Sequence, residues 1–266
     1  MRTLRFAKYH GLGNDFVVVE AEDLRAISAE DARWLCDRRR GVGADGVLVV
    51  LPAAGPDAAA RMRVINADGS VPEMCGNGVR CVAELLRARA SGQGEVLAAL
   101  TLETDAGPRV CVFEEGGVSV DMGLVRVDGI VEVRAAGTTF ALRRVDAGNP
   151  HAVTFSAVDE ATLREVGPAL STSPAFPGGA NVEFARREGD RLVVVVWERG
   201  VGPTQACGTG ACAAAAAACA EGLFQNDAPI RVALPGGSLT ITCSRSGRTS
   251  MRGPAELVFE GTVRLA

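Results

Sequence analysis

A cysteine motif occurs twice in this chain, and the spacing of its copies constrains the fold more than any other feature. The copies read EMCGNGVRC at residues 73–81 and QACGTGAC at residues 205–212, so that Cys207 follows Cys75 by 132 positions. A second pair of segments, GNDF at 13–16 and GNPH at 148–151, repeats at an offset of 135. Two unrelated motifs with nearly one offset indicate a duplicated half. Duplication would bring the two cysteines to equivalent places, facing each other across a pseudo-twofold axis.

We predict an α+β fold of two pseudo-symmetric domains, each a strand-rich, barrel-like sheet around a central helix. Short β-branched segments bounded by Gly, Pro, Asp or Asn dominate the chain, as strands do. The length of 266 residues suits two domains. We place them at residues 1–124 and 125–254, with a link near 123–129 and a last strand within 255–266 that returns to the first domain. Strands are expected at residues 16–19, 46–50, 61–65, 110–113, 118–120, 152–155, 181–184, 192–197 and 239–242.

Helical patterns fall at residues 28–39, 78–90, 159–170 and 210–222. Ser28 with Asp31 forms a capping signal for the first helix, and Asp159 places negative charge at the start of the third. The stretch 211–220 contains only Ala and Cys. Alanine is the best helix former, and this helix has no polar stripe that would face water. We therefore expect it to pass through the middle of a tightly curved sheet.

Composition excludes several classes of function. A net charge of -4 with 47% apolar residues indicates neither a nucleic-acid partner nor a membrane. The first residues lack an apolar signal core, and no apolar run reaches the length of a membrane span, so we expect a cytoplasmic protein. A single lysine, Lys8, stands against 27 arginines. Because Lys8 has no glycine-rich phosphate cradle nearby, the sequence does not indicate a pyridoxal-phosphate enzyme, and we expect no cofactor.

The position of the two motif cysteines points to acid–base chemistry at carbon. A cysteine at the first turn of a helix meets unpaired backbone N–H groups and the positive end of the helix dipole, and both favour the thiolate. The same N–H groups can bind a carboxylate. With two such helix starts opposed, one thiolate would remove the α-hydrogen of a substrate and the other thiol would return a proton from the opposite face. The stereocentre would invert.

The remaining cysteines have a simpler interpretation as small apolar residues of the core. A zinc site is not indicated, because Cys75 with Cys81, and Cys207 with Cys212, do not share a helix face. The chain also has only two histidines, His10 and His151. We predict no metal site.

Further segments carry a resemblance to the diaminopimelate epimerase family. They are HGLGNDF at 10–16, NADGS at 66–70, MCGNGVRC at 74–81, GNPH at 148–151, WERG at 197–200, ACGTGACA at 206–213 and LPGGSL at 234–239. The resemblance covers nearly the whole chain in order. It implies the pseudo-symmetric fold of that family and epimerisation of LL-2,6-diaminopimelate to the meso form, for lysine and peptidoglycan synthesis.

The resemblance also implies roles for individual residues. Cys75 and Cys207 would be the acid–base pair, supported by His151 and by Glu198, which suits a substrate ammonium group. The remaining substrate-binding residues would be Gly76, Asn77, Gly208 and Thr209 around the reacting carboxylate, Asn14 at the reacting end, and Asn66, Asn149, Asn181 and Arg199 at the far end. Two positions depart from some relatives: Gly46 replaces a substrate-contacting glutamine, and Phe259 falls near a tyrosine of the dimer interface. A homodimer is the expected assembly.

Other interpretations of these residues stay open at the level of sequence. An Asn after Gly is commonly a turn residue, Glu198 and Arg199 alone would suit a solvated ion pair, and His151 alone would suit a structural role. A proline racemase or hydroxyproline epimerase would keep the fold and the two thiols but need no distal binding set. A non-enzymatic thiol sensor would cycle through a disulfide and exchange no substrate hydrogen.

Overall fold

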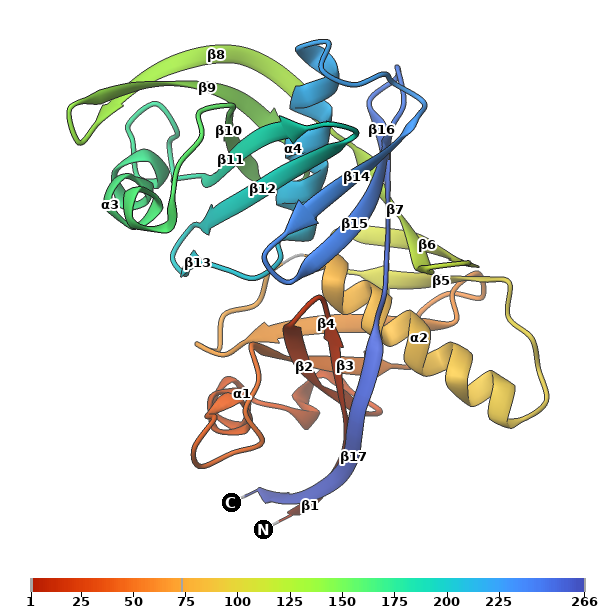
Figure 1. Ribbon diagram of the computed structural model, residues 1–266. Helices are drawn as coiled ribbons and strands as arrows, with labels where there is room; N and C mark the ends of the chain where they lie inside the picture. Colours follow the sequence, from red (N-terminus) through yellow and green to blue (C-terminus); the bar gives the residue numbers. More distant parts are fainter. Residues whose placement is uncertain (1, 73, 266) are drawn as a thin grey trace. The chain divides into compact units, whose positions relative to one another are not determined.

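A computed structural model describes residues 2–72 and 74–265 (Figure 1). Glu73, the first residue of the first cysteine motif, lies outside the described residues. The chain forms two compact units, one of residues 1–120 with 253–266 and the other of residues 121–252. Among the described residues, no helix has the length and apolar character needed to cross a membrane.

The first unit combines strands with two α-helices and a short 3-10 helix η1 (Leu24–Ala26). Its elements are β1 (Arg2–Gly11), β2 (Asn14–Glu20), α1 (Ala29–Cys36), β3 (Gly46–Leu51), β4 (Ala60–Asn66), α2 (Gly76–Gly92), β5 (Ala99–Thr104), β6 (Gly107–Glu114), the first half of β7 (Gly117–Leu124) and β17 (Glu256–Leu265).

The second unit contains the corresponding elements from the other half of the chain. They are β8 (Arg126–Ala135), β9 (Thr138–Asp146), β10 (Pro150–Thr154), α3 (Glu160–Ser171), β11 (Asn181–Glu188), β12 (Arg191–Glu198), β13 (Gly202–Pro203), α4 (Gly208–Ala220), β14 (Pro229–Leu234), β15 (Gly237–Cys243) and β16 (Arg248–Gly253).

Strand pairing confirms the duplication. In the first unit, β17 pairs antiparallel with β1, β1 with β2, β3 with β4, and β5 with β6, while β2–β3 and β4–β5 are parallel. The second unit repeats this pattern with β8–β9, β9–β10, β11–β12 and β14–β15 antiparallel, and β10–β11 and β12–β14 parallel. Each parallel connection contains a helix, as parallel pairs require. Thus α1 corresponds to α3, and α2 corresponds to α4.

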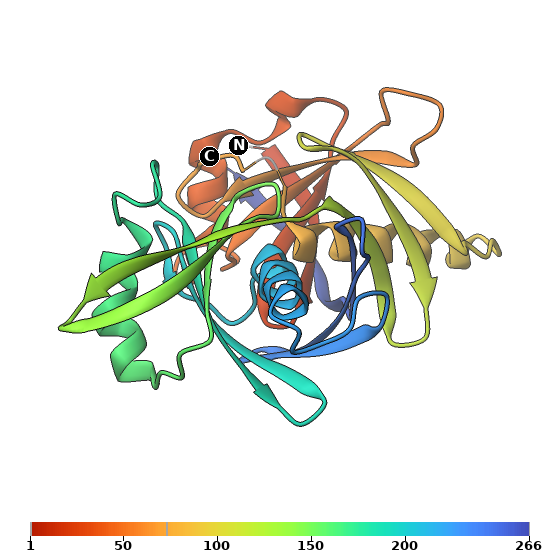
Figure 2. The same ribbon diagram turned by 90° about the horizontal axis from the view of Figure 1, so that it is seen from above.

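The helix of alanines and cysteines lies among strands of its own unit, as its composition predicts. Along α4, Ala213, Ala214, Ala215, Ala217 and Ala218 have no exposed surface. The helix contacts β8, β9, β10, β11, β12, β14 and β15, and Figure 2 shows it end-on among them. Side chains no larger than a methyl or a thiol allow strands on several sides to approach one helix.

Strands β3 and β11 are covered by helices on both faces, which decides what lies next to α2 and α4. Strand β3 contacts α1 and α2, and β11 contacts α3 and α4. On β11, Val182 and Phe184 pack in a core cluster with Leu163 and Leu170 of α3. Since side chains alternate along a strand, Glu183 between them points to the other face, toward α4.

The structure differs from the sequence-based expectation in several elements. Segments now assigned to β5, β8, β9, β14 and β16 had no strand pattern strong enough to predict. On β8, for example, exposed and half-buried residues predominate, so the buried alternation of a half-covered strand is weak. The link expected near residues 123–129 is instead the end of β7 and the start of β8, within the second unit. Strand β17 pairs with β1, so the C-terminal segment does return to the first unit.

Candidate active site

Cys75 is the N-cap residue of α2, and its sulfur satisfies one of the helix's free N–H groups. The backbone N–H of Gly78 donates to Cys75 Sγ at 3.4 Å, and the N–H of Val79 donates to the Cys75 carbonyl at 2.9 Å. A sulfur here replaces the oxygen that Ser, Asp or Asn usually supplies at an N-cap. A side chain on Gly78 would place its Cβ 2.8 Å from Leu48 Cδ2, so the glycine lets α2 begin close to β3.

Cys207 has the same place on α4. The N–H of Gly210 donates to Cys207 Sγ at 3.3 Å, and the Thr209 hydroxyl lies 3.5 Å from that sulfur. Burial raises the pKa of the Cys207 thiol well above its ordinary value, and the charges of Glu198 and Glu183 raise it further. These effects outweigh the hydrogen bonds from Thr209 and Gly210, which lower the pKa. The helix start thus lowers the pKa of Cys207, as predicted, but burial and the two carboxylates more than offset it and favour the thiol.

A chain of side-chain hydrogen bonds connects the start of α2 with the β1–β2 turn. The fully buried Arg80 donates through Nη2 to Asn77 Oδ1 at 2.9 Å. Asn77 Nδ2 donates to Asn14 Oδ1 at 3.0 Å, and Asn14 Nδ2 donates to Asp45 Oδ2 at 2.9 Å. A charged group at each end of this series of hydrogen bonds fixes the orientation of both amides, since Arg80 only donates and the carboxylate of Asp45 only accepts. Two of the predicted binding residues, Asn14 and Asn77, are thereby brought together.

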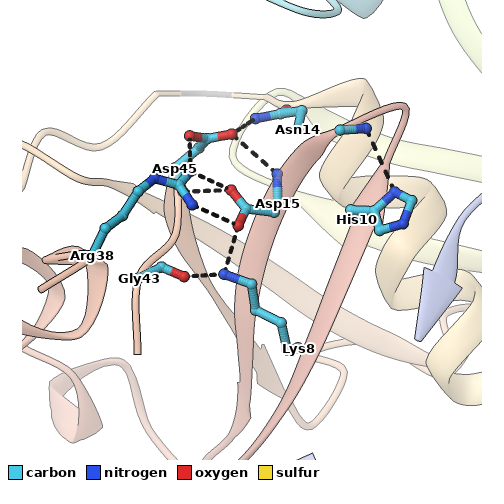
Figure 3. A network of polar contacts seen from close by, with 8 residues as sticks. Lys8, His10, Asn14, Asp15, Arg38, Gly43 and Asp45 are labelled. Carbon is cyan, nitrogen blue, oxygen red and sulfur yellow. Dashed lines mark hydrogen bonds and ion pairs between the residues drawn. The ribbon is translucent and has the colours of Figure 1, made fainter. Parts of the chain in front are cut away.

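An ion-pair network fixes the positions of Asp15 and Asp45 beside Asn14 (Figure 3). Arg38 forms a bidentate pair with Asp15 at 2.7 and 3.1 Å and also reaches Asp45 Oδ1 at 2.7 Å. Lys8, the single lysine of the chain, contacts Asp15 Oδ2 at 2.7 Å and donates to the Gly43 carbonyl. The amine of Lys8 thus contacts a carboxylate and a backbone carbonyl of its own unit (Figure 3).

In the second unit, His151 is held between two oxygen atoms. Its side chain has no exposed surface, with Nδ1 at 2.7 Å from Glu183 Oε1 and Nε2 at 2.8 Å from Asn149 Oδ1. His151 lies on β10 and Glu183 on the parallel neighbour β11. His151 therefore lies in the core of the second unit, and Asn149 lies in the turn that precedes β10.

A third group of polar residues lies where β11 begins and β12 ends. Asn181 Oδ1 accepts the backbone N–H of Arg199 at 2.9 Å, and Arg199 Nη1 donates to the carbonyl of Gly178 at 2.9 Å. Glu198 Oε1 accepts the Thr204 hydroxyl at 2.5 Å. Glu198 and Arg199 are thus not an isolated solvated ion pair, because each forms hydrogen bonds with other residues of the second unit.

The predicted residues divide between the units. Asn14, Asn66, Cys75, Gly76 and Asn77 belong to the first unit, with Asn66 at the end of β4 where its amide donates to Ser70 Oγ at 3.0 Å. The second unit holds the others, namely Asn149, His151, Asn181, Glu198, Arg199, Cys207, Gly208 and Thr209. Within residues 2–72 and 74–265, no three His, Cys, Asp or Glu side chains gather to hold a metal ion.

Sequence reasoning missed Asp15, Arg38, Asp45, Arg80 and Glu183. Arg38 and Asp45 lie in a loop region without a periodic pattern, and their meeting with Asp15 depends on the parallel pairing of β2 and β3. Glu183 carried a usable signal, because it is the one charged residue inside the apolar run Val182 to Ala185. A charge in a covered strand is rare unless it is paired.

Comparison with known proteins decides the family. The family model described as diaminopimelate epimerase matches residues 6–127 and 143–258. The chain belongs to the diaminopimelate epimerase family. It is 44% identical to the diaminopimelate epimerase of Desulforudis audaxviator, over 97% of this chain and 98% of that protein. Identity to the diaminopimelate epimerase of Synechococcus elongatus is 41%, over 99% of both chains.

Solved structures show that the fold extends beyond the diaminopimelate epimerase family. A hydroxyproline epimerase from Agrobacterium vitis superposes with a TM-score of 0.72 at 18% identity, covering 98% of this chain and 92% of that chain. A phenazine biosynthesis protein of the PhzF family from Bacillus anthracis gives a TM-score of 0.73 at 17% identity, covering 100% of both chains. At this level of identity the likeness concerns the fold alone, and it confirms the predicted fold class.

The network around Asp15 predicts acid sensitivity in the first unit. Burial alone would raise the pKa of the Asp15 carboxyl, but hydrogen bonds from Arg38 and Lys8 together lower it from 3.8 to about 2. That change corresponds to about 2 kcal/mol of stability, fully present above pH 3.8 and lost as the pH falls through about 2. We expect Asp15→Asn to reduce the free energy of unfolding by about this amount at pH 7, measured by urea denaturation.

The difference between wild type and Asp15→Asn should shrink below about pH 4 and vanish as the pH falls below about 2, because the carboxyl of the folded wild type is then protonated as well. Asp57→Asn, at an exposed loop position, serves as the control. A loss of stability for Asp15→Asn that is the same at pH 7 and pH 2 would contradict this origin.

Proposed function

We propose that the chain epimerises LL-2,6-diaminopimelate to the meso form as an isomerase that uses no pyridoxal phosphate. Membership of the diaminopimelate epimerase family supports this reaction and its place in the synthesis of lysine and of peptidoglycan precursors. The observation that carries the mechanism is the equivalence of Cys75 and Cys207: each caps a corresponding helix, and each sulfur accepts the N–H three residues later.

In the proposed reaction, the two sulfurs act on opposite faces of one α-carbon. A thiolate takes the α-hydrogen, so that an S–H bond forms as the C–H bond breaks and the electron pair moves toward the substrate carboxylate. The opposite thiol then gives its proton to the carbon and becomes the thiolate. One proton per cysteine pair is therefore present before and after each turnover, and the configuration inverts.

The helix starts suit the charge that develops during this step. Gly76 and Asn77 begin α2, and Gly208 and Thr209 begin α4, so their N–H groups lie in the first turn of each helix, where the positive end of the helix dipole favours an anion. Donors fixed before the reaction stabilise an enolate-like carboxylate without having to reorganise. Burial and the charges of Glu198 and Glu183 raise the pKa of Cys207, which favours its thiol form and suits this residue to serve as the acid.

A further set of polar residues would bind the far end of the substrate. Arg199 uses Nη1 for backbone carbonyls, which leaves Nε and Nη2 to face a carboxylate. Asn149, Asn181 and Asn66 offer amide groups for the distal carboxylate and ammonium, and Glu198 offers a carboxylate for an ammonium group. These contacts would separate diaminopimelate from an ordinary amino acid.

A cytoplasmic homodimer also belongs to the proposal. Leu257, Val258 and Phe259 of β17 are about half exposed, at 50%, 53% and 45%, and adjacent apolar side chains of this size commonly mark a protein interface. Sedimentation velocity of the purified chain tests the assembly.

Removal of either sulfur tests the reaction. We expect Cys75→Ala and Cys207→Ala each to reduce epimerisation of LL-2,6-diaminopimelate by at least about 10³-fold, because an acid and a base are both needed in each direction. Chiral chromatography of the product measures this loss. Cys219→Ala, on the same helix as Cys207, is the matched control and should keep wild-type activity.

Proline serves as the control substrate and should not racemise, since it has no distal carboxylate or ammonium. Wild-type activity in either sulfur variant would contradict the two-base mechanism. Racemisation of proline at a rate comparable with diaminopimelate would contradict the proposed substrate.

A further inference from the structure

Glu183 is a buried carboxylate that the mechanism above does not use. It has no exposed surface, and among the described residues its Oε2 has no hydrogen-bond partner. An ionised carboxylate in such a place is costly unless it is paired. Its one observed side-chain partner is His151, through Oε1.

The duplicated half shows that the fold itself does not require this pair. In the first unit, Phe16 pairs in register with Gly46 and Val18 with Leu48; in the second, His151 pairs with Asn181 and Val153 with Glu183. Phe16 and Leu48 therefore occupy the positions that His151 and Glu183 occupy in the second unit. The same scaffold thus holds two apolar residues in one half and two ionisable residues in the other.

Glu183 also lies directly beside the start of α4. A Cβ on Gly210 would stand 2.7 Å from Glu183 Oε1 and 3.2 Å from Cys207 Sγ, so both atoms approach one point of the first helical turn. At the equivalent point of the first unit, Gly78 meets the apolar Leu48. The negative charge of an ionised Glu183 therefore repels the negative charge of a Cys207 thiolate and disfavours ionisation of the thiol.

Hydrogen-bond directions leave one proton to be placed between Glu183 and His151. The carbonyl oxygen of Asn149 faces His151 Nε2, so Nε2 carries a hydrogen and donates. The contact of 2.7 Å between Nδ1 and Glu183 Oε1 then holds a second hydrogen, either on nitrogen as an imidazolium or on oxygen as a carboxylic acid. Both forms keep the same bond to Asn149.

Other charged groups surround this pair without bonding to Glu183. On β12, the charge of Glu198 acts on Cys207. Asp146, which ends β9, interacts electrostatically with His151 and is itself paired with Arg126 at 2.6 Å. The carboxylates whose charges act on Cys207 are thus Glu198 and Glu183, and of these Glu183 is the one in contact with an imidazole, that of His151.

We propose that Glu183 and His151 share one proton whose position follows the charge on Cys207. When Cys207 is a thiol, the proton is on His151 Nδ1 and Glu183 is ionised. When Cys207 is a thiolate, the N–H bond breaks and an O–H bond forms on Glu183 Oε1, so a neutral acid faces the thiolate. No proton enters or leaves the pair. This role rests on the proposed function, and it makes Glu183 a positioning residue for charge rather than a group that touches substrate.

Burial supports the exchange, because it raises the pKa of Glu183 toward that of an imidazole. The constant bond from Nε2 to Asn149 also means that Asn149 presents its amino group in both states, ready for an anionic oxygen of the substrate. The shared proton of Glu183 and His151 therefore lets Cys207 change its charge while Asn149 keeps the same hydrogen-bonding group directed at the substrate.

Alkylation of Cys207 tests the proposal without substrate. In a Cys75→Ala background, the pH dependence of iodoacetamide labelling at Cys207, followed by peptide mass spectrometry, reports the thiol's midpoint. We expect Glu183→Gln to move that midpoint to lower pH by at least about one unit, since the thiolate no longer requires a proton to be displaced. Glu188→Gln, at the end of the same strand, is the control and should leave the midpoint unchanged. An unchanged midpoint in Glu183→Gln would overturn the proposal.

Nitrogen-15 NMR provides a second test with Glu183 in place. The chain has two histidines, so His10→Gln assigns the His151 signals. In the Cys75→Ala background, we expect Nδ1 of His151 to change from protonated to bare at the same pH at which Cys207 ionises. In Cys207→Ser, the loss of the hydrogen from His151 Nδ1 should no longer occur at that pH. A His151 that keeps one protonation state through the Cys207 midpoint, or a transition unchanged in Cys207→Ser, would overturn the proposal. Neither readout depends on diaminopimelate, so failure of the proposed reaction would be recognised separately.

Discussion

The unpaired N–H groups at the start of α2 and α4 are the constraint around which both halves of this protein are arranged. A helix must satisfy these donors, and in each half a cysteine sulfur accepts one of them. The sulfur is thereby fixed at a helix N-terminus beside donors that an anion can use. Small residues maintain the arrangement: Gly78 and Gly210 allow close approach to a neighbouring strand, and the alanines of α4 allow strands on several sides.

Each half then adds a different environment to the same scaffold. The first unit surrounds Asn14 and Asn77 with full charges, Arg80 at one end and Asp45 with Arg38 at the other, which fix both amide directions. The second unit places a buried histidine and a buried carboxylate where the first has Phe16 and Leu48. Because burial and nearby carboxylates raise the pKa of Cys207, the two cysteines are equivalent in backbone geometry but not in their surroundings. Such a difference suits a pair in which one member starts as acid and the other as base.

Repetition in the sequence predicted much of this structure, and the limits of that prediction are physical. Motif spacing identified the duplication, the helix starts at both cysteines, and the central helix of α4, because these depend on local residue types. Strands such as β8 escaped because one exposed face weakens their alternation. Glu183, Arg38 and Asp45 escaped because their importance arises from pairing between distant segments. For Cys207, the local sequence predicted the lowering of the pKa by the helix start, but not the larger opposing effects of burial and of the carboxylates of Glu198 and Glu183, which depend on the fold.

Isotope labelling at early times tests most directly whether two separate thiols exchange the α-proton. When LL-2,6-diaminopimelate reacts in deuterium oxide, a two-base enzyme delivers solvent deuterium from one sulfur while the other holds the abstracted hydrogen. We therefore predict that, in the first few per cent of reaction, the meso product carries deuterium at the inverted carbon and the recovered LL isomer carries none. Equal deuterium in product and recovered substrate from the outset would show a single exchanging base and contradict the account.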